Sequence, residues 1–208
     1  MHTQTKETQA QLTPEAALRI LLEGNKRFLS QSPAERHFIE QVNATAEGQY
    51  PFACVLSCID SRVPAELVFD QGVGDLFSIR IAGNFINDDI LGSLEFGCKL
   101  AGSMVIMVLG HTSCGGVKGA CDNAELGHLT QMLDKIKPAV DAVKTEPGTD
   151  RSSKNKEFVD RVAEENVRLN VKAIPERSSV LKGLVDEGKL IIVGAMYDVS
   201  SGKVTLVD

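Results

Sequence analysis

One histidine and two cysteines occupy positions where they could hold a metal ion. His111 and Cys114 lie three residues apart in the glycine-rich segment VLGHTSCGGVKG, after an apolar run, and Cys58 follows another apolar run in the segment SCIDSR. Two thiolates and one imidazole suit Zn²⁺, and three protein ligands leave one tetrahedral position for water. Cys58, His111 and Cys114 are therefore candidate ligands of a catalytic zinc site, with one Zn²⁺ in each chain.

Asp60 and Arg62 follow Cys58 at alternating positions, so an extended backbone would direct all three side chains to one side. A carboxylate beside a metal-bound water can accept its hydrogen bond, while a bidentate arginine keeps that carboxylate ionised and oriented. The residues leave a second arrangement open, in which Asp60 leaves Arg62 and binds zinc itself. Such a closed site, used only for stability or binding, is the non-catalytic alternative for this protein.

The glycine-rich segment fits two other chemistries less well. A phosphate-binding P-loop needs a lysine and then Ser or Thr after its second glycine, whereas Gly116 and Val117 follow Gly115. A cysteine phosphatase needs an arginine about six residues after its nucleophile, and neither candidate cysteine has one. The residues alone leave open a cysteine nucleophile paired with His111.

The remaining cysteines are expected to lie outside the site. The chain has five cysteines, an odd number with no regular spacing, which favours reduced thiols over disulfides. Cys54, Cys98 and Cys121 are predicted to be buried side chains that behave as small apolar groups.

The segments that must position the candidate ligands alternate between strands and helices. Strands are predicted at residues 52–57, 75–81, 104–109 and 190–195. Helices are predicted at residues 13–29, 88–102, 120–143, 157–173 and 176–187. This order predicts an α/β fold with a mainly parallel central β-sheet flanked by helices. Cys58 and His111 then follow neighbouring strands, at the edge of the sheet where ligands bind in such folds.

The two ends of the chain are predicted to add an N-terminal helical arm and a C-terminal hairpin. Thr13 is a suitable N-cap for the helix at residues 13–29, and the polar residues 30–49 are expected to form a loop or arm. Residues 145–157 are expected to form an exposed loop. Residues 200–202 (Ser-Ser-Gly) separate two β-prone segments and so predict the hairpin.

Length and charge restrict the class of protein. A chain of 208 residues is long enough for one domain, and its net charge of −6, without a lysine or arginine run, argues against a nucleic-acid partner. The longest apolar runs are far shorter than the ~20 residues that span a bilayer, so no membrane association is expected. The first eleven residues lack the apolar core of a signal peptide, which favours the cytoplasm; a signal removed earlier would be consistent with the periplasm.

Three segments, CIDSRVPAE, RIAGN and GHTSCGGV, resemble in order and spacing the signature segments of the β-class carbonic anhydrases. The terminal segment GAMYDVSSGKV is similar too, so the resemblance covers most of the chain. It implies a lyase that catalyses the zinc-dependent, reversible hydration of carbon dioxide to bicarbonate and a proton. By this resemblance Cys58, His111 and Cys114 are the zinc ligands, and Asp60 with Arg62 is the dyad that orients the zinc-bound hydroxide.

The resemblance also carries expectations about pH and assembly. Two thiolates give the metal more charge than imidazoles would, which should keep the pKa of the bound water higher. Activity is therefore expected to rise with pH between about 6 and 9. The family implies a homodimer or a tetramer of dimers, with residues 1–50 as a helix and arm in the dimer interface. Residues 51–208 would then form the zinc-binding α/β catalytic domain.

Two further points separate members of the resembled family. Some members have a second, regulatory bicarbonate site made by a tryptophan, an arginine and a tyrosine; Arg80 and Tyr197 match two of these positions, but Val55 replaces the tryptophan. Relatives on the same scaffold hydrolyse carbonyl sulfide or carbon disulfide, which are linear analogues of CO₂. This second zinc hydrolase activity is the nearest alternative to CO₂ hydration.

Overall fold

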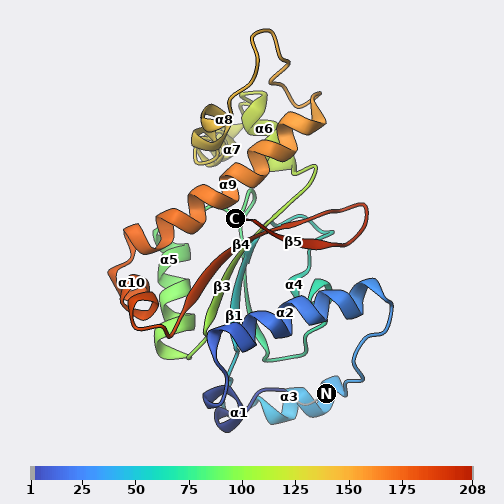
Figure 1. The fold of residues 1–208 in the computed structure, drawn as a ribbon, viewed down its shortest axis with the longest axis vertical. Helices are drawn as coiled ribbons and strands as arrows, with labels where there is room; N and C mark the ends of the chain where they lie inside the picture. The colour runs from blue at the N-terminus through green and yellow to red at the C-terminus, as the bar shows by residue number, and fades with distance from the viewer. Residues whose placement is uncertain (1–2, 208) are drawn as a thin grey trace.

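A five-stranded sheet forms the centre of the protein, as Figure 1 shows for the computed structural model, which describes residues 3–207. The strands are β1 (Ala53–Ser57), β2 (Leu76–Arg80), β3 (Val105–His111), β4 (Ile191–Tyr197) and β5 (Val204–Val207), in the spatial order β2-β1-β3-β4-β5. β1 to β4 run parallel, and β5 pairs antiparallel with β4. The predicted mainly parallel sheet and the C-terminal hairpin are both confirmed.

Helices cover both faces of the sheet. They are α1 (Lys6–Ala10), α2 (Pro14–Leu29), α3 (Phe38–Ala44), α4 (Ala65–Val68), α5 (Asp88–Glu95), the π-helix η1 (Phe96–Leu100), α6 (Gly115–Cys121), α7 (Gly127–Leu133), α8 (Lys137–Ala142), α9 (Lys156–Arg177) and α10 (Ser179–Asp186). On β1, Val55 packs in a core cluster with Leu21 of α2, whereas Leu56 packs in another with Leu94 of α5. This alternation follows from the two-residue period of a strand buried on both faces.

Helix α2 is fixed to the sheet domain by capping and by close packing. The Thr13 side chain accepts the hydrogen bond of the Ala16 backbone N–H, as an N-cap should. A Cβ on Gly24 would lie 1.7 Å from the carbonyl oxygen of Phe69, so only glycine lets α2 approach this closely. Asn25, buried in the same helix, donates to the carbonyl oxygens of Val68 and Gly202.

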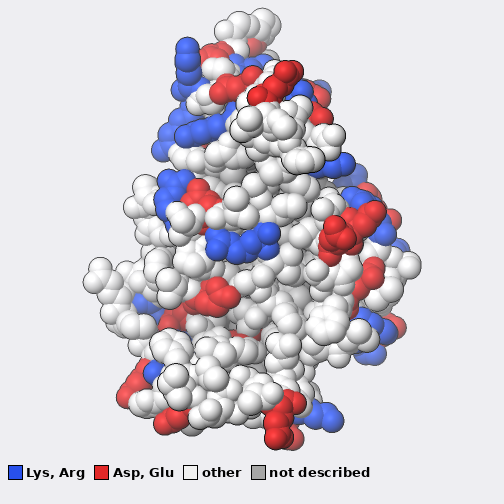
Figure 2. Space-filling view, turned by 180° about the vertical axis from the view of Figure 1, so that it is seen from behind, with Lys and Arg blue, Asp and Glu red and all other residues white. Residues whose placement is uncertain are grey.

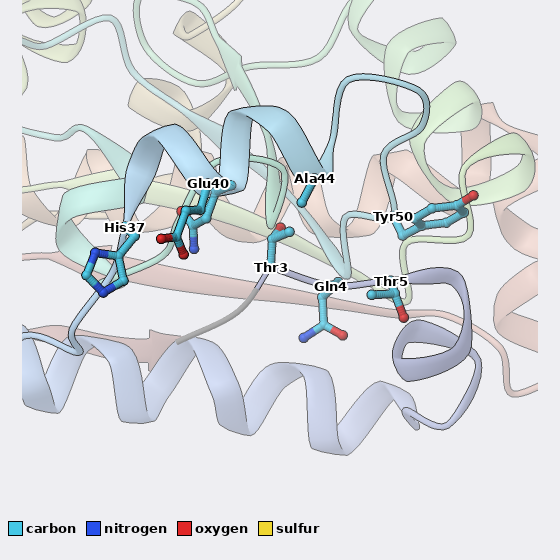
Figure 3. Close-up of a pocket in the computed structure, with 8 residues that line it drawn as sticks. Thr3, Gln4, Thr5, His37, Glu40, Ala44 and Tyr50 are labelled. Carbon is cyan, nitrogen blue, oxygen red and sulfur yellow. The ribbon is translucent and has the colours of Figure 1, made fainter.

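Residues 30–49, which were expected to form a loop or arm, contain the short helix α3. α3 and the N-terminal segment enclose a cavity of about 380 Å³ (Figure 3), lined by Thr3, Gln4, Thr5, His37, Glu40, Gln41, Ala44 and Tyr50. The cavity belongs to the N-terminal part of the chain and contains none of the candidate metal ligands.

Two helix predictions were wrong in their boundaries. The predicted helix at residues 120–143 is replaced by three short helices, α6 to α8; Asn123, between α6 and α7, and Gly127, the first residue of α7, have positive φ angles that a continuous helix does not allow. α9 runs through Pro175 to Arg177, since a proline in a final turn loses only one helical hydrogen bond. Ser178 then caps α10 by accepting from the Leu181 N–H.

Charged side chains of both signs are interspersed over the face seen in Figure 2, where uncharged residues cover most of the surface. Within residues 3–207, no helix is long and apolar enough to cross a membrane.

Candidate metal centre

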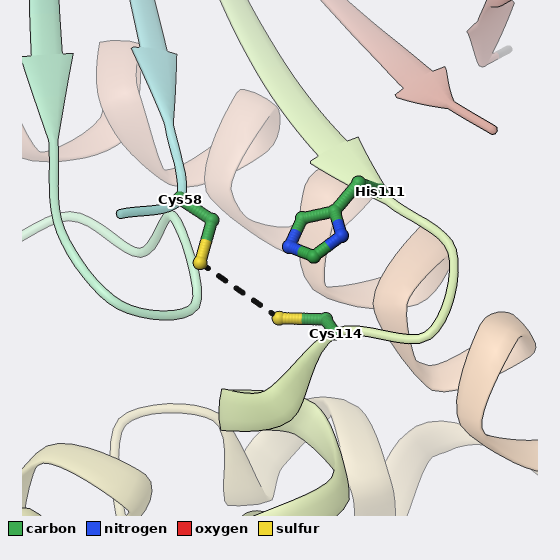
Figure 4. Close-up of side chains that lie close together, drawn as sticks. All are labelled: Cys58, His111 and Cys114. Atoms are coloured by element: carbon green, nitrogen blue, oxygen red, sulfur yellow. Dashed lines mark hydrogen bonds between the residues drawn. The ribbon is translucent and has the colours of Figure 1, made fainter. Parts of the chain in front are cut away.

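The three predicted ligands come together at the carboxyl ends of neighbouring parallel strands. Cys58 directly follows β1, His111 is the last residue of β3, and Cys114 precedes α6. Their ligand atoms all lie within 4.8 Å of one another, and the two sulfurs are 4.0 Å apart (Figure 4). All three side chains are buried. The sheet register therefore produces a compact group that could hold a metal ion.

The imidazole of His111 presents one nitrogen to this group. Its Nδ1 lies 3.0 Å from the carbonyl oxygen of Thr112, which accepts the Nδ1–H and leaves Nε2 with its lone pair. Nε2 is buried and has no hydrogen-bond partner within residues 3–207. Because an unpaired buried polar atom costs about 1–3 kcal/mol, a ligand for Nε2 is expected, and a metal ion fits this donor set.

The two thiols favour ionisation of one sulfur. The hydrogen bond between the two thiols lowers the pKa of Cys58, against the opposing effect of burial, and the Gly83 N–H adds a second donor to the Cys58 sulfur at 3.4 Å. Cys114 keeps its proton in this arrangement, because the shared bond and burial raise its pKa. Thiolate is the form of cysteine that binds metals, so one ligand is already prepared.

A hydrogen bond holds Ser113, the residue with an uncommon backbone conformation in the turn before Cys114. Ser113 has a φ of +56°, which is uncommon for a residue with a side chain, and its N–H donates to Asp160 of α9 at 2.8 Å. The glycines around this turn allow close packing: a Cβ on Gly110 would lie 2.6 Å from Val167, and one on Gly116 3.3 Å from the Gly83 nitrogen. They therefore bring α6 and α9 close to the metal group.

Asp60 and Arg62 form a bidentate ion pair beside the group. The Arg62 Nη2 and Nε donate to the two carboxylate oxygens at 2.7 and 2.9 Å, and the Arg62 backbone N–H donates to Oδ1 at 3.0 Å. These bonds hold the pKa of Asp60 well below its usual range, although burial opposes them. The Asp60 Oδ2 lies 3.9 Å from the His111 Nε2.

The backbone around this pair is not extended as predicted. Asp60 to Val63 form a turn closed by the Val63 N–H on the Asp60 carbonyl, at 3.0 Å. The two side chains still meet because an aspartate commonly bonds the backbone two residues ahead. Asp60 is paired with Arg62 here and is not part of the metal-ligand group.

Sequence reasoning missed residues that hold the loops around the group. Arg80 donates from Nε to the Cys58 carbonyl at 2.9 Å and from Nη2 to the Asp60 carbonyl at 2.6 Å. Val55, which occupies the tryptophan position of the regulatory site expected from the resemblance, is fully buried in the core. Arg80 therefore supports the backbone of the metal loop in this structure.

The other cysteines lie away from the metal group, as predicted. Cys54, Cys98 and Cys121 are buried and unpaired, and the sulfurs of Cys54 and Cys98 are 4.0 Å apart. Burial raises the pKa of Cys121 to about 11, so its thiol stays protonated.

Fold and site together define an α/β protein with a Cys₂His group, at the carboxyl ends of parallel strands, that could hold a metal ion. The sequence model of the family described as carbonic anhydrase matches residues 53–204, so the chain belongs to the carbonic anhydrase family. Carbonic anhydrase 2 of Mycobacterium tuberculosis is 34% identical over 94% of this chain and 93% of its own length.

Solved structures assign the chain to the β class of that family. The β-carbonic anhydrase CafA of Aspergillus fumigatus is 28% identical, with a TM-score of 0.70 over 93% of this chain and 90% of that one. Two tetrameric β-carbonic anhydrases of Sordaria macrospora share the fold at 23% identity, with a TM-score of 0.69 over 89% of this chain and 90% of the matched chain. The general reaction of the family is the hydration of CO₂.

Proposed function

We propose that this protein catalyses the reversible hydration of CO₂ to bicarbonate and a proton with one Zn²⁺ per chain, held by Cys58, His111 and Cys114. The observation that carries the proposal is the buried group of two thiols and an imidazole whose Nε2 has no other partner among the described residues. Zn²⁺ lowers the pKa of water from ~15.7 toward ~7 and so supplies a hydroxide nucleophile near neutral pH.

Asp60 orients the nucleophile in this proposal. Its carboxylate stays ionised at any pH where the enzyme works, because Arg62 holds its pKa well below the usual range. An ionised carboxylate can only accept hydrogen bonds, so Asp60 binds the hydrogen of the nucleophile and leaves an oxygen lone pair for CO₂. Arg62 keeps Asp60 turned toward the site by two parallel hydrogen bonds.

The pairing of Asp60 with Arg62 also favours catalysis over the non-catalytic alternative. A closed zinc site would need Asp60 as a fourth protein ligand, which its two bonds to Arg62 oppose. With three protein ligands, one position is available to water and substrate.

We further propose a homodimer or a tetramer of dimers, with residues 1–50 as the helical arm in the interface and residues 51–208 as the catalytic domain. Helix α3 exposes Phe38, Ile39 and Val42, which together make an apolar surface that favours burial against a second copy. Ile59, between Cys58 and Asp60 in the sequence, is 61% exposed. The loop that carries Cys58 therefore also exposes an apolar side chain that favours burial against a second copy. An active monomer in size-exclusion light scattering would contradict this assembly.

Stopped-flow CO₂ hydration at pH 8.5 tests the function on protein analysed for zinc, with Cys58→Ser as the matched ligand variant. We expect rapid hydration by the zinc-loaded protein and loss of both zinc and activity in Cys58→Ser. Parallel assays with carbonyl sulfide and carbon disulfide test the related hydrolase activity. Absence of CO₂ hydration by zinc-loaded protein would overturn the proposal.

A further inference from the structure

Two buried amides on α9 form a hydrogen-bonded pair one helical turn apart. Asn166 and Asn170 are 2% and 7% exposed, and the Asn170 Nδ2 donates to the Asn166 carbonyl at 2.7 Å and to its Oδ1 at 3.2 Å. Burying an amide costs free energy unless its polar atoms are bonded. The remaining polar atoms of the pair are free to bind another segment of the chain.

That segment is the loop between β2 and α5. The Asn166 Nδ2 donates to the Gly83 carbonyl at 2.8 Å, and the Asn170 Oδ1 accepts the Ile86 N–H at 2.8 Å. The loop needs such support because Gly83 and Asn84 both have positive φ angles, +82° and +39°. The two amides therefore fix a strained loop against α9.

The same loop contacts the metal group through one backbone donor. The Gly83 N–H points to the Cys58 sulfur at 3.4 Å, within hydrogen-bond range for sulfur. A donor on a ligand sulfur withdraws charge from it and so reduces the charge that the thiolate gives to a bound metal. The position of Gly83 thus affects the metal without any contact between metal and loop.

We propose that Asn166, supported by Asn170, is a positioning residue that fixes the Gly83 N–H on the Cys58 sulfur and so sets the charge that Cys58 donates to the metal. The inference rests on the proposed function only in taking Cys58 as a metal ligand. Asn166 acts through Gly83 and touches neither metal nor substrate in this role.

Cobalt substitution tests the inference on the full-length protein without an activity assay. Co²⁺ bound by thiolate gives a sulfur-to-metal charge-transfer absorption whose energy falls when the sulfur loses a hydrogen bond. We expect Asn166→Ala to move this absorption to longer wavelength, because the Cys58 sulfur loses the hydrogen bond from the Gly83 N–H. Asn170→Ala, which removes the support of Asn166, should give a smaller shift in the same direction.

Asn25→Ala is the matched control, because Asn25 is 3% exposed and joins α2 to distant backbone groups by comparable bonds. We expect this variant to lose thermal stability while keeping the cobalt spectrum of the unmodified protein. If Asn166→Ala does not fold, Asn166→Asp and Asn170→Ala carry the test. An unchanged absorption in the folded variants overturns the inference, whereas a missing sulfur-to-cobalt absorption in the unmodified protein overturns the proposed metal site itself.

Discussion

Replacing each member of the Asp60–Arg62 pair separates the roles proposed for them. Asp60→Asn keeps the shape of the side chain but removes the charge, whereas Arg62→Gln leaves the carboxylate and removes its two charged donors. If Asp60 orients the nucleophile and Arg62 only holds Asp60, the first change should reduce kcat/KM far more than the second. Both variants should retain one zinc per chain, because neither residue belongs to the metal-ligand group.

The exposure of the two side chains gives the size of each effect. The Asp60 side chain is 16% exposed, so its hydrogen bond to the nucleophile is a largely desolvated, charged one, worth about 1.5–3 kcal/mol or about 10- to 150-fold in rate. The Arg62 side chain is 50% exposed, so solvent screens its ion pair to about 1 kcal/mol or less, which corresponds to a loss of up to about fivefold.

The assay is stopped-flow CO₂ hydration at pH 8.5 on zinc-analysed protein. The folded pKa of Asp60 lies below its unfolded value near 3.9, so the contribution of the pair to stability is present above about pH 4, including the assay pH, and both variants remove it. Equal losses in the two variants would show that Arg62 acts directly on the reaction. Full activity of zinc-loaded Asp60→Asn would refute the orienting role.

Three further predictions concern pH, metal binding and stability. Two thiolates should leave the metal-bound water with a higher pKa than three imidazoles would, so the rate of hydration should rise between about pH 6 and 9. A flat pH–rate profile would contradict this prediction. Cys114→Ser and His111→Ala should each reduce zinc, measured by atomic absorption, from one per chain to near zero. Asp70→Asn should lower the melting temperature by about 6–12 °C, because Asp70 is 8% exposed and pairs with Arg27 and Arg36, and breaking a buried pair costs about 3 kcal/mol. A melting temperature of Asp70→Asn within 2 °C of that of the unmodified protein would contradict this prediction.

The sequence was sufficient to predict the sheet and the proximity of Cys58, His111 and Cys114. The segments around Cys54 and Ile106 are short, mostly apolar and buried throughout, which is typical of parallel strands covered on both faces. Once those strands are neighbours, residues at their carboxyl ends meet at one edge, so Cys58 and His111 converge without any knowledge of the loops.

Loop conformation was much less predictable. An alternating pattern gave extended backbone at residues 58–62, yet a local hydrogen bond closes a turn at Asp60. The break between α6 and α7 depends on positive φ angles at Asn123 and Gly127, which these residue types permit but do not require.

The residues that hold the metal loops carry no sequence signal of that role. Arg80 and Asn166 bond backbone carbonyls that are distant in sequence, and any residue type supplies the same carbonyl. Asp160 likewise bonds a backbone N–H, that of Ser113. Such contacts follow from the tertiary arrangement of β2 and α9 around the loops and become visible only in the structure.

Zinc titration of the metal-free protein tests whether the hydration of CO₂ depends on one zinc ion per chain. Zinc is removed with a chelator, returned in measured amounts, and the initial rate of CO₂ hydration is followed at pH 8.5 after each addition. We expect no catalysis without zinc, a linear rise of the rate with added zinc, and a plateau at one equivalent per chain that Cys58→Ser does not reach. A hydration rate that is independent of zinc, or a chain that binds one zinc and hydrates no CO₂, would contradict it.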